Sequence, residues 1–69
     1  MIEIRLNGET RQIPSGLNIP GLLRHIEIHA DRVAVELNRE IVRKSEWDSM
    51  LIEAGAEVEV VHFVGGGSR

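Results

Sequence analysis

Only one segment of this 69-residue chain has the spacing of an amphipathic helix, and most of the rest alternates polar and apolar residues as strands do. Asn18 is a suitable N-cap and Pro20 fits the first helical turn. The apolar face of this predicted helix consists of Ile19, Leu22, Leu23 and Ile26. We expect the helix to end near residues 28–30. A chain of this length holds one small hydrophobic core, so the helix must pack against a sheet.

Five strands are predicted, the first and third from period-2 alternation and the other three from the turns that precede them. They span residues 2–7, 9–13, 33–37, 40–42 and 57–64. The dipeptide Asn7-Gly8 separates the first two strands and is typical of a type I′ turn, in which both central residues have positive φ. Asn38-Arg39 marks a second tight turn, and Gly55 turns the chain into the last strand.

The segment before the last strand is predicted to close one end of the core. Ser45 and Asp48 have the Ser-x-x-acid spacing of a capped helical turn. Trp47 is expected to fill the core beneath this turn. Leu51 and Ile52 are expected to tuck under the sheet.

The order of these elements predicts an α+β fold of the ubiquitin-like β-grasp type, with a mixed four- to five-stranded sheet wrapped around one helix. The first and last strands would then be central and parallel. We expect a β-grasp domain over residues 1–64 and a flexible C-terminal glycine tail over residues 65–69.

Charge and composition argue against several function classes. The net charge is −3, aromatic residues make up 3% of the chain, and lysine and arginine do not cluster, so nucleic-acid binding has little support. The first five residues alternate polar and apolar, and no apolar run approaches the length of a membrane span. We therefore expect a cytoplasmic protein with no membrane partner.

Metal and nucleophile chemistry also lack support in the side chains. The chain has no cysteine, which removes disulfides, thiolate metal sites and a cysteine nucleophile. His25 and His29 have i, i+4 spacing, but no further ligand is placed to complete a site, and we expect no bound metal or cofactor. No catalytic triad or carboxylate pair is predicted, so an enzyme with its own active site is not expected.

The most informative feature for function is the run of Gly65, Gly66 and Gly67, which directly follows the apolar end of the last strand. Three consecutive glycines lose much backbone entropy on ordering and offer no side chain to pack. An enzyme that threads a chain end into a narrow slot requires residues without a Cβ. The tail is therefore predicted to be the site of chemistry, carried out by another protein.

Val61 and Phe63 are predicted to form a docking surface beside this tail. Val58 and Val60 should point into the core, which places Val61 and Phe63 on the open face of the last strand. Large apolar residues on an open face suggest a partner surface. Scattered exposed apolar residues are also common, so their position next to the tail is what favours docking.

Several segments resemble the bacterial ThiS family of ubiquitin-like sulfur carriers in thiamine biosynthesis. The similar segments span residues 32–38, 40–42, 45–47 and 57–67, and the last of these is the most specific. A diglycine tail alone would leave open a MoaD-like carrier or another ubiquitin-like modifier with a different acceptor.

The resemblance implies that a ThiF-like adenylating enzyme uses ATP to activate the carboxylate of Gly67, with Gly65 and Gly66 threading into that enzyme. A sulfur donor, such as a cysteine desulfurase or a rhodanese-type protein, would then convert the adenylate to a thiocarboxylate. A ThiG-like thiazole synthase would take the sulfur for the thiazole ring of thiamine.

Ser68 and Arg69 depart from the family pattern, because such carriers normally stop at the second glycine of the pair. With Ser68 attached, Gly67 has no free carboxylate. Three accounts stay open: a native extension removed by a processing peptidase, which we favour, a foreign extension, or a chain that does not carry sulfur.

Overall fold

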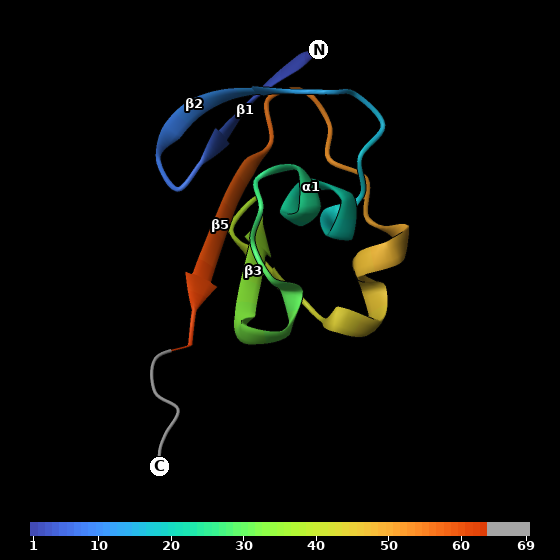
Figure 1. Ribbon diagram of the computed structural model, residues 1–69. Coiled ribbons are helices and arrows are strands. Elements are labelled where there is room, and N and C mark those ends of the chain that lie inside the picture. Colours follow the sequence, from blue (N-terminus) through green and yellow to red (C-terminus); the bar gives the residue numbers. More distant parts are fainter. Residues whose placement is uncertain (64–69) are drawn as a thin grey trace.

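The computed structural model describes residues 1–63, and within them five strands form one mixed sheet in the order β2-β1-β5-β3-β4 (Figure 1). The strands are β1 (Ile2–Leu6), β2 (Glu9–Ile13), β3 (Val33–Leu37), β4 (Glu40–Val42) and β5 (Glu57–His62). β1 and β5 pair in parallel, and the other neighbours pair antiparallel. The predicted α+β, β-grasp arrangement is confirmed, with β5 in the middle of the sheet.

Both predicted tight turns are present, and both place their two central residues in the left-handed region. Asn7 and Gly8 have φ of 51° and 83°, and Asn38 and Arg39 have φ of 52° and 73°. These values are typical of type I′ turns, whose twist matches that of the strands they join. β1 ends at Leu6 rather than at residue 7, because Asn7 is already the first central residue of the turn.

The helix α1 (Ile19–His25) begins as predicted but ends earlier than the expected residues 28–30. At its start the Asn18 side-chain oxygen accepts a hydrogen bond from the Gly21 amide at 2.8 Å. At its end the Ile28 amide donates to the Leu23 carbonyl and the Glu27 amide donates to the Arg24 carbonyl. This bond pair is a Schellman motif, and it places Glu27 at φ 63°, a conformation that stops the helix.

Replacing Glu27 with glycine is expected to stabilise the domain. The left-handed conformation costs a residue with a Cβ about 1 kcal/mol, and a carboxylate at a helix C-terminus also faces the negative end of the helix dipole. We expect Glu27→Gly to raise the free energy of unfolding by about 0.5–1 kcal/mol in a urea titration. Glu27→Ala removes the charge but keeps the Cβ. It should therefore raise the free energy of unfolding by a smaller amount, which comes from the lost repulsion with the helix dipole alone. A less stable glycine variant would contradict this account.

The core lies between α1 and the face of the sheet that it covers (Figure 1). Its buried apolar side chains are Ile4, Leu6, Ile13, Ile19, Leu22, Leu23, Val33, Val35, Leu37, Val42, Trp47, Ile52, Ala56, Val58 and Val60. The predicted core contributors are among them except for Ile26, which is partly buried against the core, and Leu51. Leu51 was expected beneath the sheet but is 58% exposed, because the strand-like stretch that contains it alternates and buries Ile52 instead.

The segment between β4 and β5 differs from its predicted form. It is a 3₁₀ helix, η2 (Lys44–Ser49), which begins after Arg43 without a side-chain cap, so the predicted capping role of Ser45 is wrong. The turn is held instead by Trp47, whose indole nitrogen donates to the Val42 carbonyl at 2.9 Å and whose ring is buried. Trp47 therefore fills the core as predicted.

No helix within residues 1–63 is both long enough and apolar enough to cross a bilayer.

Candidate functional site

The strand that leads to the glycine tail, β5, is fixed on its β1 side by Asn7. The Asn7 side-chain oxygen accepts a hydrogen bond from the Val60 amide at 2.8 Å, and its amide nitrogen donates to the Val60 carbonyl at 3.3 Å. β1 ends at Leu6, so the Asn7 side chain continues the pairing where backbone partners end. An asparagine that is favoured in the turn by its tolerance of positive φ therefore also holds β5.

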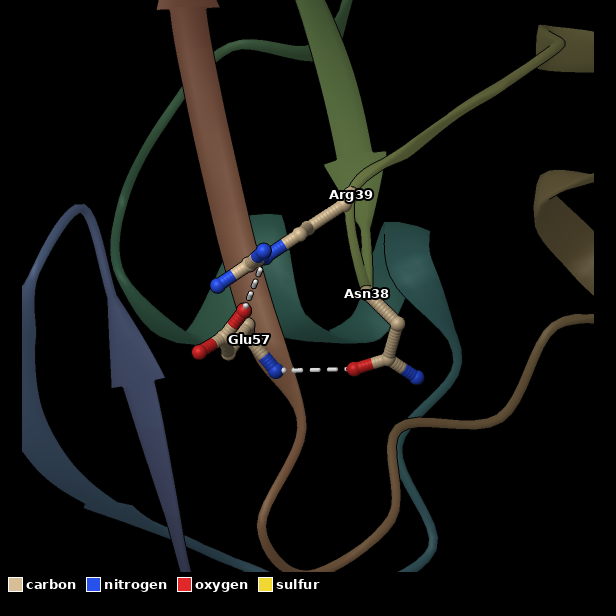
Figure 2. Close-up of polar contacts among 3 residues, drawn as sticks. All are labelled: Asn38, Arg39 and Glu57. Carbon is tan, nitrogen blue, oxygen red and sulfur yellow. Dashed lines mark hydrogen bonds and ion pairs between the residues drawn. The ribbon is translucent and has the colours of Figure 1, made fainter.

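A second turn asparagine holds the start of β5 from the β3 side. Figure 2 shows Asn38 and Arg39, both from the turn between β3 and β4, converging on Glu57. The Asn38 side-chain oxygen accepts from the Glu57 amide at 3.0 Å, and the Asn38 amide donates to the Glu57 carbonyl at 2.7 Å. Arg39 Nε lies 3.2 Å from Glu57 Oε1, across the first residue of β5.

Val61 and Phe63 lie where the sequence predicted them, on the face of the sheet opposite α1. Val61 is 50% exposed and Phe63 is 61% exposed, whereas Val58 and Val60 are buried. The Phe63 amide donates to the Arg32 carbonyl at 3.0 Å, so the chain is still held to the sheet at this point. β5 itself ends at His62, short of the predicted residue 64, which lies outside the described residues.

His62 is exposed, although it follows the buried Val58 and Val60 at the same period-2 spacing along β5. Its register partner is Val33, at the end of the sheet. The helix α1 already ends at His25. His62 faces an open depression that Ile28 and Arg32 also line. The pattern of alternation indicated the correct side of the strand, but the helix was too short to cover this position.

The predicted reacting residue, Gly67, and the predicted threading residues, Gly65 and Gly66, lie outside the described residues. Their role stays a prediction.

Two residues on the open face, Ile41 and Glu36, were missed by the sequence analysis. Ile41, Glu36 and Glu59 lie side by side in one row across β4, β3 and β5, because Glu36 is the register partner of both others. Ile41 is 72% exposed. Strand parity could have placed each of them on this face, but the pairing of β4 with β3 and of β3 with β5 was needed to bring them together.

No group of three or more histidine or acidic side chains that could hold a metal ion is found in residues 1–63. His25 and His29 do not share a helix face, because α1 ends at His25 and His29 precedes the next helical turn, η1 (Ala30–Arg32). Both side chains are exposed. What this part of the chain presents is a sheet face beside the start of the glycine tail.

Comparison with known proteins connects this arrangement to one family. The crystal structure of the thiamine biosynthesis protein ThiS from Geobacter metallireducens superposes with a TM-score of 0.85 at 30% identity, covering 96% of this chain and 100% of that one. The uncharacterized protein ycf40 of Porphyra purpurea is 30% identical over 96% of this chain and 93% of its own length.

A longer relative also matches. A thiazole synthase of Magnetococcus marinus is 35% identical over 99% of this chain, although the chain spans only 21% of the length of that relative. The sequence model of the ThiS family matches residues 4–67, which is nearly the whole chain. The chain therefore belongs to the ThiS family.

Proposed function

We propose that this protein carries sulfur as a thiocarboxylate on Gly67 for the formation of the thiamine thiazole ring. The observation that supports this most directly is that the family match runs to residue 67 and so includes the whole glycine run. The absence of cysteine from the chain leaves no thiol side chain to carry sulfur. The carrier is thus a substrate of other enzymes.

The proposed chemistry begins at the carboxylate of Gly67. A carboxylate resists nucleophilic attack until one of its oxygens becomes part of a leaving group. A ThiF-like enzyme supplies this by joining the carboxylate to the α-phosphate of ATP and releasing pyrophosphate. The terminal sulfur of a persulfide on the donor then bonds to the acyl carbon as AMP departs. A thiol next attacks the other sulfur of the resulting acyl disulfide, which releases the thiocarboxylate and leaves the thiol oxidised in a disulfide with the donor. Glycine suits the steps at the acyl carbon because it has no Cβ to crowd that carbon.

The proposed partners act in sequence on the same terminus. They are the ThiF-like adenylating enzyme, a cysteine desulfurase or rhodanese-type sulfur donor, and a ThiG-like thiazole synthase. The last is supported by the thiazole synthases of two bacteria, each of which contains a segment similar to this chain within a longer protein. We place these reactions in the cytoplasm, where ATP is available. Where Ser68 follows Gly67, a processing peptidase must first expose the glycine carboxylate.

The proposal assigns different roles to the folded domain and to the C-terminal tail. Residues 1–64 form the domain that partners recognise, and residues 65–69 form the tail on which they act. Val61 and Phe63 dock against a partner while the tail is processed. Their support is the exposure of both side chains on the open face, within four residues of Gly65.

Intact-mass spectrometry of the protein isolated from cells tests the proposal. We expect a population that ends at Gly67 and whose mass differs from that of the free acid by the exchange of one oxygen for sulfur. A strain that lacks the adenylating enzyme is the control and should show the free acid alone. Isopeptide adducts to lysines, without any sulfur exchange, would instead assign the chain to the ubiquitin-like modifiers. Binding to the large subunit of molybdopterin synthase would indicate a MoaD-like acceptor.

A further inference from the structure

The open face of the sheet carries two glutamates at directly opposed positions. Glu36 on β3 and Glu59 on β5 are register partners, so their side chains begin about 5 Å apart on the same face. Like charges in directly opposed cross-strand positions destabilise a sheet. Within residues 1–63 neither carboxylate has an ion-pair partner, since the ion pair found there joins Arg39 to Glu57.

The nearby arginines are held in other contacts. Arg39 lies against Glu57, and an Arg5 guanidinium nitrogen donates to the Gly8 carbonyl at 3.0 Å. These groups border an open depression of about 270 Å³ whose lining also includes Glu36 and Glu59. The lining therefore carries two positive side chains, Arg5 and Arg39, and three negative ones, Glu36, Glu57 and Glu59, so its net charge is −1.

Apolar side chains flank the glutamate pair. Ile41 is the register partner of Glu36 on the β4 side and is largely exposed. Val61 lies two residues beyond Glu59 on the same face of β5, next to its register partner Ala34. The surface is thus a pair of like charges set between exposed apolar residues, a pattern that fits a basic group with apolar surroundings.

We propose that this face, formed by Ile41, Glu36, Glu59, Ala34 and Val61, docks a protein partner that inserts a lysine or arginine side chain between the two glutamates. The inserted cation removes the repulsion that the free domain tolerates, and apolar contacts with Ile41 and Val61 surround it. The surface thereby extends the proposed Val61 and Phe63 docking face across β3 to β4. This inference rests on the proposed function, because it assumes that partners approach the face beside the tail.

The test compares the stability of the free protein with its affinity for partners. Glu36→Gln and Glu59→Gln in the full chain should each raise Tm by about 1–4 °C at low ionic strength, and high salt should reduce the gain. The same variants should lower the affinity for the adenylating enzyme or the thiazole synthase of the same genome about five- to tenfold in a calorimetric titration. Glu46→Gln, an exposed acid on η2, is the matched charge control and should change neither quantity.

The outcomes separate this inference from the proposal on which it rests. A higher Tm with unchanged affinity for both partners would overturn it, as would an unchanged Tm. A variant that carries both Glu36→Gln and Glu59→Gln tests for a metal ion. If Mg²⁺ alone raises the Tm of the wild type but not of this double variant, the glutamate pair binds a metal ion instead. Phe63→Ala provides the reference, since it should lower affinity without raising Tm. If Phe63→Ala also leaves both affinities unchanged, the docking face itself is wrong, while sulfur carriage is tested independently by mass.

Discussion

A chain that ends at Gly67 is expected to be adenylated, whereas the 69-residue chain is not. In the longer chain the carbonyl of Gly67 belongs to a peptide bond with Ser68, so it has no carboxylate oxygen to attack ATP. The free carboxylate lies on Arg69, whose Cβ and long side chain do not fit a slot shaped for glycine. Release of pyrophosphate from ATP by the adenylating enzyme measures the difference directly.

Two further chain ends make this experiment sharper. A chain that ends at Gly66 keeps a glycine terminus but shortens the reach by one residue, and a 1–67 chain with Gly67→Ala keeps the length but adds a Cβ. Both should be activated more slowly than the 1–67 chain. All forms retain residues 1–63, so equal thermal unfolding would show that the fold is unchanged. Equal activation of the 67- and 69-residue chains would remove Gly67 as the reacting residue.

The fold was predictable because the local signals agree with one another. Two asparagine-centred turns, one capped helix and the parity of each strand all indicate the same sheet. The error at the end of α1 occurs where a residue adopts a conformation that its type does not favour. Glu27 stops α1 in a left-handed conformation that glycine usually adopts, so the pattern predicted a longer helix.

The candidate site was predictable only in the part that is local in sequence. The open-face position of Val61 and Phe63 was predicted from the alternation of side chains along a single strand. The row of Ile41, Glu36 and Glu59 depends on the register between three strands, which a single sequence does not specify. The bonds from Asn7 to Val60 join residues 53 positions apart in the chain, so the turn signal predicted the conformation of Asn7 but not its partner.

Asn7 is expected to be the polar side chain whose loss most weakens the attachment of β5. The odd-numbered residues of β5 direct their backbone groups toward β3, as the bonds from Asn38 to the Glu57 carbonyl and from Phe63 to the Arg32 carbonyl show. The Val60 amide therefore faces β1, where the strand has already ended and the Asn7 oxygen is its acceptor. Removing that oxygen leaves a part-buried amide without its partner.

Three substitutions separate the side-chain bonds of Asn7 from its backbone conformation. Asn7→Gly tolerates the positive φ, so its loss of about 1–2 kcal/mol in the free energy of unfolding reports the missing bonds. Asn7→Ala adds the strain of a Cβ in the left-handed region and should lose about 1 kcal/mol more. Asn7→Asp keeps an oxygen acceptor and should remain closest to the wild type.

Hydrogen exchange at the Val60 amide measures the loss of the Asn7 bond locally, whereas the free energy of unfolding reports on the whole domain. This amide should exchange faster in Asn7→Gly than in Asn7→Asp, because only the aspartate keeps an acceptor for it. The Glu57 amide, bound by Asn38 on the other side of β5, is the internal control and should keep its protection wherever the domain stays folded. A glycine variant with wild-type stability and a protected Val60 amide would show that Asn7 serves only the turn. Faster exchange at Val60 alone would show that a hairpin-turn side chain positions the strand that presents Val61 and Phe63.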